Sequence, residues 1–301
     1  MHPNIVTLNS KFRPGPTIRI DDPALPHGTD LWIKREDLLH PVISGNKWRK
    51  LKYILDHALK LGYRNIISMG GAYSNHLHAL AFAGRELGLA TTGIIRGERP
   101  EQPNTTMKDL QNWGMTLHFV SRTTFRKLRE CKQWDSEPGQ KYRGYWIPEG
   151  GSSPLALAGI TEMVNDIPIE FQTIALACGT GVTLAGTISA LVSDQFALGF
   201  AVLKGAGFLE KEVENLLRTT GKSVSQPAEI LLDYHFGGFA KRNQKLIRFM
   251  TDFERRNNIP LDPVYTGKLM YGLYHLINNQ KLKNQRIVAI HTGGLQANRS
   301  Y

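Results

Sequence analysis

The feature that most constrains the fold is a regular alternation of apolar runs, rich in Val, Ile and Leu, with segments of helical periodicity. This alternation is typical of a mostly parallel sheet with helices on both faces, so it predicts an α/β protein. The predicted strands are 31–36, 65–69, 92–96, 116–120, 144–147, 172–177, 198–203, 229–233 and 286–290. The predicted helices are 46–61, 75–88, 104–112, 122–132, 153–165, 182–193, 208–218, 241–257 and 267–279.

The Pro- and Gly-rich stretch 136–154 is the best candidate for a crossing between domains. It predicts a small α/β domain at 50–155, inserted into a larger domain that combines 1–49 with 156–301. Two lobes of this kind leave a cleft between them, which is a usual place for a ligand.

Composition narrows the classes of function. The net charge is +11, but the basic residues are scattered among acidic ones without an aromatic–basic ribbon, which argues against nucleic-acid binding. The 10 histidines show no metal spacing, so no metal site is expected. There is no apolar run of the roughly 20 residues that a bilayer requires, and the first residues lack the pattern of a secretory signal. With only two cysteines, far apart, we expect a cytoplasmic protein that binds neither membrane nor nucleic acid.

The segment Ser44–Leu51 places Gly45 and Asn46 directly before Lys47, at the start of a strongly helical stretch. The positive end of a helix dipole repels an ammonium at this position and lowers its pKa. A lysine with a lowered pKa offers the free amine that forms an imine with an aldehyde. The alternative is an ordinary surface lysine in a basic first turn.

Two further turns follow predicted strands and open predicted helices. Gly70–His76 places Ser74, as a nucleophile or proton carrier, and Asn75 where backbone amides bind anions. Ala177–Gly186 combines successive amides with two threonine hydroxyls, which suits one phosphate group. Each turn can equally be a capped helix or a tight strand–helix connection.

Two polar loops complete the set, Asp262–Lys268 and His291–Gly294. Tyr265 can transfer a proton if it is buried near a cation, and otherwise these are turn and cap residues. Together the motifs supply an amine, a phosphate cup, polar anchors and a hydroxyl. A pyridoxal-phosphate enzyme needs these groups from its protein, because the cofactor itself supplies the electron sink.

With these motifs in this order, the chain resembles the fold type II pyridoxal-phosphate enzymes, which are tryptophan synthase β-like. Within them it is similar to the group of D-cysteine desulfhydrase and 1-aminocyclopropane-1-carboxylate (ACC) deaminase. The matching segments are Lys34–Asp37, Gly45–Lys47, Ser74–His76, Ile147–Ser152, Thr180–Gly186, Asp262–Lys268 and His291–Gly294. The resemblance implies two three-layer α/β domains with the cofactor between them, a small amino-acid substrate and a homodimer.

The resemblance also implies a role for individual residues. The cofactor ligands would be Lys47, Lys50, Asn75, Thr180, Gly181, Val182, Thr183 and Thr292. Lys47 would be the Schiff-base lysine, Asn75 would contact the cofactor's 3′-oxygen, and Thr292 would face the pyridine nitrogen. The catalytic groups would be Lys47, Ser74 and Tyr265. The substrate would meet Ser74, Asn75, His76, Thr266 and Phe239, with its carboxylate on the first three.

Thr266 and Thr292 help to choose between the two activities. ACC deaminases resemble this sequence but carry Glu and Leu at these two positions. A carboxylate beside the pyridine nitrogen keeps it protonated and strengthens the electron sink for opening an unreactive ring. A threonine leaves the nitrogen neutral, which suffices when a thiolate leaves. The pair favours desulfhydrase-like elimination, which gives pyruvate, sulfide and ammonia.

Two departures from the family pattern leave the substrate open. Phe239 stands where the family has a second tyrosine, and Tyr73 replaces a common Gln. ACC deamination and racemisation on the same scaffold therefore stay as alternatives. From other classes, so do a pyridoxal-phosphate-binding protein with little catalysis and a basic nucleic-acid binder.

Overall fold

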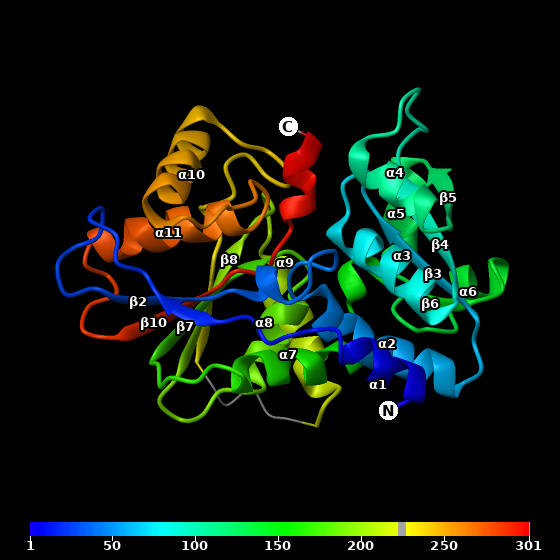
Figure 1. Cartoon of the computed structure of the whole chain (residues 1–301), viewed down its shortest axis with the longest axis horizontal. Coiled ribbons are helices and arrows are strands. Elements are labelled where there is room, and N and C mark those ends of the chain that lie inside the picture. The colour runs from blue at the N-terminus through cyan, green and yellow to red at the C-terminus, as the bar shows by residue number, and fades with distance from the viewer. Residues whose placement is uncertain (222–226, 301) are drawn as a thin grey trace.

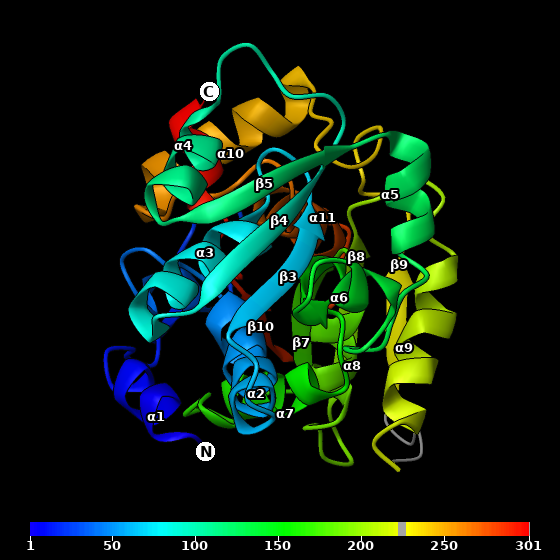
Figure 2. The ribbon, with the colours of Figure 1, turned by 90° about the vertical axis from the view of Figure 1, so that its right-hand side faces the viewer.

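The structure is a computed structural model that describes residues 1–221 and 227–300. It contains two separate sheets (Figures 1 and 2). The larger has the order β1-β2-β10-β7-β8-β9 and the smaller β5-β4-β3-β6. Every pairing is parallel except that of β1 with β2, so the predicted parallel α/β fold is confirmed. The larger sheet comprises β1 (Thr17–Arg19), β2 (Asp30–Lys34), β7 (Thr173–Cys178), β8 (Phe196–Ala201), β9 (Ala228–Leu231) and β10 (Arg286–Ile290), and the smaller β3 (Asn65–Gly70), β4 (Ala90–Arg96), β5 (Met115–Val120) and β6 (Tyr145–Ile147).

The helices largely follow the predicted positions. They are α1 (Pro3–Asn9), α2 (Lys47–Lys60), α3 (Asn75–Leu87), α4 (Thr105–Asn112), α5 (Arg122–Leu128), α6 (Glu137–Lys141), α7 (Leu155–Asn165), α8 (Val182–Ile188), α9 (Phe208–Arg218), α10 (Gln244–Asn257) and α11 (Thr266–Asn278). Short 3₁₀ turns cover Glu36–Leu38, Glu149–Gly151 and Leu295–Ser300. The predictions missed α1, α6 and β1, which have seven, five and three residues.

Two predicted helices, 122–132 and 182–193, are shorter than expected. They end at Leu128 and Ile188 because the amides that follow the C-cap residues Arg129 and Ser189 bond three residues back, not four. Examples are Cys131 N to Leu128 O at 3.2 Å and Leu191 N to Ile188 O at 3.3 Å. This tighter bonding replaces the α-helix by 3₁₀-type turns.

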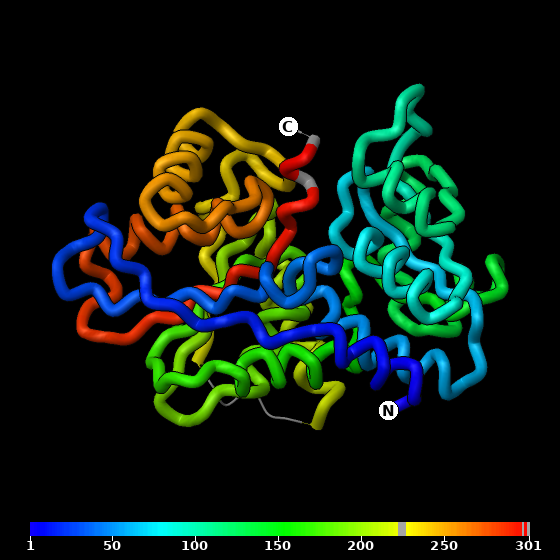
Figure 3. The backbone as a smooth tube through the Cα atoms, in the orientation of Figure 1, coloured from blue at the N-terminus to red at the C-terminus, as the bar shows by residue number. Residues whose placement is uncertain are grey.

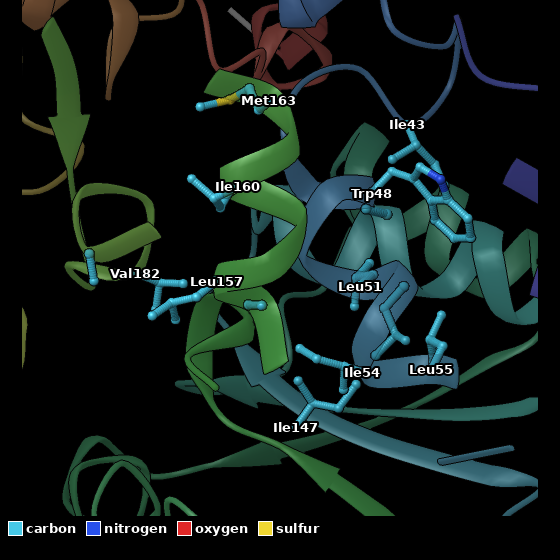
Figure 4. Close-up of a cluster of buried hydrophobic side chains, with 14 of the residues drawn as sticks. Ile43, Trp48, Leu51, Ile54, Leu55, Ile147, Leu157, Ile160, Met163 and Val182 are labelled. Carbon is cyan, nitrogen blue, oxygen red and sulfur yellow. The ribbon is translucent and has the colours of Figure 1, made fainter. Parts of the chain in front are cut away.

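Helix α2 carries the predicted lysine and is packed against α7. Its apolar side, including Trp48, Leu51 and Ile54, lies in one buried cluster with Leu157 and Ile160 of α7 (Figure 4). The predicted stripe of Leu51, Ile54, Leu55, Ala58 and Leu59 is buried throughout. The two backbones approach closely at Gly159, where an added Cβ would lie 1.8 Å from the Arg49 carbonyl oxygen.

A buried ion cluster fixes the first turn of α2. The Arg49 guanidinium donates to both carboxylate oxygens of Glu36, at 3.0 and 3.1 Å, and pairs with Asp166 at 2.7 Å. Glu36 is fully buried, and it follows β2 of the larger sheet by two residues. The start of α2 is thereby tied to both the larger sheet and the end of α7.

The C-terminal turn, Leu295–Ser300, lies between the two halves of the molecule (Figure 3). Asn298 donates to the Leu261 carbonyl at 3.0 Å, while Arg299 forms an ion pair with Asp109 of α4. The chain end thus links loops of the larger-sheet half to a helix beside the smaller sheet.

The domain boundaries at 49/50 and 155/156 stay a prediction. Within the described residues, no helix has the length and apolar character that crossing a bilayer requires.

The Gly159 contact gives a stability test. Replacing Gly159 with Ala should destabilise the fold by at least about 1–3 kcal/mol, because the added methyl group forces α7 away from α2. The measurement is the free energy of unfolding from urea denaturation. Gly207 is a matched control, since it has α-helical dihedral angles and nothing within 4 Å of an added Cβ. Equal stability of the G159A and G207A variants would contradict the close approach.

Candidate active site

The predicted lysine and the predicted phosphate turn are joined through one amide side chain. Lys47 is the first residue of α2 and is half-buried. Its Nζ donates to Asn46 Oδ1 at 3.2 Å, and Asn46 Nδ2 donates to Thr183 Oγ1 at 3.2 Å. Asn46 precedes the helix but makes no capping bond with its side chain. The Asn46 side chain therefore bonds to Lys47 and Thr183 instead of capping α2.

The Lys47 amine is partly unprotonated near neutral pH. Burial lowers the pKa of Lys47 to about 8, and the negative charge of Asp262 opposes this lowering. The sequence pattern predicts a lowered pKa of Lys47 from the helix dipole, whereas the structure identifies burial as the main cause of the lowering. A pKa near 8 leaves about one amine in ten free at pH 7, so the side chain can act as a nucleophile or base.

Lys50 is a buried cation without an anion. Its side chain is buried, and its ammonium has no hydrogen-bond or ion-pair partner in residues 1–221 and 227–300. Burial and the neighbouring Lys47 charge hold the pKa of Lys50 well below its usual value. The adjacent Cys178 stays a neutral thiol, because burial raises its pKa to about 12. A buried ammonium of this kind requires an anionic partner.

The turn before α8 is the predicted phosphate turn, and the first amides of the helix have no acceptor within the helix. Gly181 precedes the helix with φ +77°, a left-handed conformation that suits glycine. Thr180 lies against Gly150, where an added Cβ would be 3.1 Å from Thr180 Cγ2. The turn from Thr180 to Thr183 therefore contacts the 3₁₀ turn at 149–151 and is bonded to Asn46.

The start of α3 carries the predicted carboxylate anchors. Ser74 caps the helix by accepting a hydrogen bond from Leu77 N at 3.2 Å, which is the structural role that the sequence allowed. The first amides of a helix, here those of Asn75 and His76, have no acceptor within the helix. Asn75 Oδ1 accepts a hydrogen bond from Gln296 of the C-terminal turn.

His76 is held in one neutral form. Ser68 donates its only hydroxyl proton to the Ile147 carbonyl at 2.8 Å, so it accepts from His76 Nε2 at 2.8 Å. Burial and the charges of Lys47 and Lys50 lower the pKa of His76 to about 3. His76 Nδ1 is left as a buried acceptor with no partner in the described part of the chain.

The Lys47 amine lies over the ring of Tyr265, 5.9 Å from its centre. An added Cβ at Gly179 would be 3.2 Å from this ring, which lies edge-on to Phe239. Burial raises the pKa of Tyr265, so its hydroxyl keeps its proton. Phe239 is 43% exposed and presents a ring without a hydroxyl.

The two threonines differ in their surroundings. The Thr266 hydroxyl is buried and donates to Asp262 Oδ1 at 2.8 Å, so it is bound to the chain itself. The Thr292 carbonyl accepts from Asn46 N at 3.3 Å, beside a backbone crossing of Gly45 with Gly293. Both crossing glycines have positive φ, and a Cβ on either would overlap the opposing backbone.

Sequence reasoning gave no role to Asp262, Lys268 or Gln296. Asp262 followed by Pro263 is a recognisable turn and cap signal, and this signal alone could have indicated a structural role for Asp262. Gln296 reaches Asn75 from 221 residues away, a distance at which no local pattern gives a signal. A separate cavity of about 380 Å³, lined by Trp134, Tyr145 and Leu216 among others, includes none of the predicted site residues.

Comparison with known proteins decides the family. The family described as "Pyridoxal-phosphate dependent enzyme" matches residues 9–293. The chain belongs to this family. Its architecture is that of the fold type II pyridoxal-phosphate enzymes, and pyridoxal phosphate is its cofactor.

Several relatives match over the full length. A Pyrococcus horikoshii protein named as a proposed ACC deaminase is 32% identical, over 100% of this chain and 98% of the relative. The bifunctional D-cysteine desulfhydrase/ACC deaminase of Arabidopsis thaliana, a mitochondrial protein, is 30% identical over 96% of this chain and 78% of its own length. A crystal structure of an ACC deaminase homologue has a TM-score of 0.80 at 31% identity, covering 98% of this chain and 96% of that one.

The residues of this pyridoxal-phosphate enzyme fit the cofactor. Lys47 offers an amine for the aldehyde, and the turn before α8 offers amides for the phosphate. Lys50 is the buried cation that lacks an anion. The cofactor carries both the aldehyde and the dianion that this arrangement requires.

The buried charge of Lys50 predicts opposite effects on stability and on cofactor binding. Replacing Lys50 with Met should stabilise the cofactor-free protein by about 1 kcal/mol or more, because an unpaired buried ammonium is removed. Affinity for pyridoxal phosphate should fall about 10- to 100-fold, because charged hydrogen bonds to the phosphate are lost. Urea denaturation and equilibrium titration measure the two effects.

The buried Lys50 also determines how the stability of the cofactor-free protein depends on pH. The pKa of Lys50 is lower in the folded chain than in the unfolded one, so the unfolded chain binds more protons between these values. The stability of the cofactor-free protein therefore rises with pH in that window, and less so in the K50M variant. The exposed Lys60 on the same helix, replaced with Met, is the control. A K50M protein that is less stable and binds the cofactor normally would contradict the assignment.

Proposed function

We propose that the chain is a lyase that removes the β-substituent of a small amino acid, acting most like a D-cysteine desulfhydrase. The products from D-cysteine would be pyruvate, sulfide and ammonia. The observation that carries the proposal is the link Lys47–Asn46–Thr183, which connects a partly free amine to the turn that would bind the phosphate. The name of the Arabidopsis thaliana relative and the threonines at 266 and 292 support the choice of substrate.

The proposed roles follow the surroundings of each group. When bound, pyridoxal phosphate supplies an electron sink for the charge that develops at the substrate Cα. Lys47 Nζ would take the α-proton, since its lowered pKa makes it a base near neutral pH. Tyr265 would donate a hydrogen bond to the departing thiolate, because its hydroxyl keeps its proton. Ser74 and the amides of Asn75 and His76 would receive the substrate carboxylate.

The remaining proposed contacts position the cofactor. Its phosphate would lie between Lys50 and the residues Thr180, Gly181, Val182 and Thr183. Asn75 would meet the 3′-oxygen and Thr292 the pyridine nitrogen. Thr266 and Phe239 would border the substrate, Thr266 through its side chain next to Asp262 and Phe239 through its ring beside Tyr265.

A second candidate is ACC deamination. It is favoured by the names of the Pyrococcus horikoshii relative and of the solved homologue. We further propose that the protein is a cytoplasmic homodimer. The family resemblance supports the dimer, and two cysteines that form no disulfide support a reducing compartment.

Lys47 gives the first test of the proposal. Replacing Lys47 with Ala should abolish the visible absorbance that the wild type shows when loaded with pyridoxal phosphate, because the amine that binds the aldehyde is gone. The Lys60→Ala variant, changed at the exposed end of the same helix, should keep the absorbance. Visible absorbance that persists in the K47A variant would contradict the assignment of Lys47 as the Schiff-base lysine.

A substrate panel gives the second test. The wild type should release 2-oxo acid and sulfide from D-cysteine faster than 2-oxo acid from ACC, because thiolate is the better leaving group. The panel contains D- and L-amino acids and ACC, with 2-oxo acid, sulfide and optical rotation as readouts. Preference for ACC would favour the second candidate, and a change in rotation without 2-oxo acid would indicate a racemase. No turnover at all would indicate a binding protein.

A further inference from the structure

Asp262 is a buried carboxylate that accepts hydrogen bonds from the residues that follow it in the chain. It is 1% exposed. Its Oδ2 accepts from Val264 N at 2.9 Å and from Tyr265 N at 3.0 Å. Its Oδ1 accepts from Thr266 N and Thr266 Oγ1, both at 2.8 Å. No ion pair within 4.0 Å neutralises it among the described residues.

The four bonds order the turn that leads into α11, and they use both carboxylate oxygens as acceptors. An Asn side chain has one acceptor oxygen, so the turn itself favours a carboxylate at this position. A charge that is buried without a cation nevertheless costs free energy, so a second role beyond the turn is expected.

The surroundings of Asp262 supply one. Its negative charge raises the pKa values of Lys47 and Lys268 against the effect of burial. It also lies beside Gly294, where an added Cβ would be 3.2 Å from Asp262 Cγ and 2.6 Å from Asn75 Nδ2. Asp262 is thus at the junction of the segments that carry Tyr265, Thr292 and Asn75.

The other groups that face Lys47 cannot take this role. Lys50, one turn further along α2, carries the same sign of charge as the Lys47 ammonium. His76 on α3 is neutral, because its pKa is about 3. The Tyr265 hydroxyl stays protonated, since its pKa is raised. Asp262 is the carboxylate whose charge acts on the Lys47 amine.

We propose that Asp262 is a positioning residue of the active site, which holds Tyr265 beside Lys47 and supplies the fixed negative charge that faces the Lys47 amine. The charge holds most of the Lys47 side chain as the ammonium at pH 7 and leaves about one amine in ten free. A group that must take up a proton and return it needs both forms. The consequence for turnover rests on the proposed function, whereas the effect on the Lys47 amine does not.

The test measures the Lys47 amine in the cofactor-free protein. Lysines are acetylated with a trace of acetic anhydride over a pH series, and the peptide that contains Lys47 is quantified by mass spectrometry. The labelling midpoint should lie near 8 in the wild type. In the Asp262→Asn variant it should fall by about one pH unit, because an opposite charge is removed. An unchanged midpoint overturns the proposal.

Asp22 provides a matched control in the same half of the molecule. It is also buried and accepts four hydrogen bonds, at 2.9 Å from Ala24 N and at 2.7 Å each from Arg256, Asn257 and Tyr274. The Asp22→Asn variant should lose thermal stability without moving the Lys47 midpoint. An equal shift in both variants would show that the midpoint reports general loosening, and would overturn the proposal.

A second variant guards against misfolding of the first. Asp262→Ser keeps a hydroxyl oxygen that can accept a hydrogen bond from the amides of the turn before α11. It should lower the Lys47 midpoint as D262N does. In the cofactor-loaded enzyme, the pH profile of turnover should shift in the same direction. If the enzyme turns nothing over, the labelling midpoints still decide the role of Asp262, so failure of the proposed function is distinguishable.

Discussion

The pairing of Arg49 with Glu36 and Asp166 is the interaction on which the active site depends. It fixes the first turn of α2, two residues beyond Lys47, relative to the larger sheet and to the end of α7. Charges this deeply buried stabilise a fold only when every partner is in place, and loss of one partner costs about 3–5 kcal/mol. The result is that the backbone of Lys47 is held in a fixed position. Gly159 adds to this, because it lets α7 approach the same turn more closely than any side chain would allow.

The site concentrates positive charge where folding alone would avoid it. Lys47, Lys50 and Lys268 all have lowered pKa values because they are buried, and the Asp262 carboxylate offsets part of that burial for Lys47 and Lys268. Such an arrangement is costly for the protein without its cofactor and favourable for an anion that enters. Natural proteins retain unfavourable groups of this kind at functional sites, at the expense of stability. The unpartnered acceptor of His76 belongs to the same pattern.

Much of this architecture was predictable because local sequence patterns determine it. Every predicted strand was found, since buried parallel strands are continuous β-branched runs that few other structures produce. β1 was missed because three residues at an antiparallel edge carry no such run. The glycine-rich turns were located by composition, but their mutual contacts were not. The Asn46 bridge joins residues 137 positions apart, and no sequence pattern indicates which way an amide side chain points.

The assignment of Thr266 shows why residue type alone is an incomplete guide. Its hydroxyl is occupied by Asp262, so it cannot also bond a ligand with that proton. A glutamate at 266 would bring a second carboxylate against a buried one, and two adjacent carboxylates cannot both stay ionised in such surroundings. Threonine avoids that repulsion and leaves the charge of Asp262 directed toward the lysines. The neutral side chain at 266 is therefore a consequence of the buried charge at 262 as much as of the substrate.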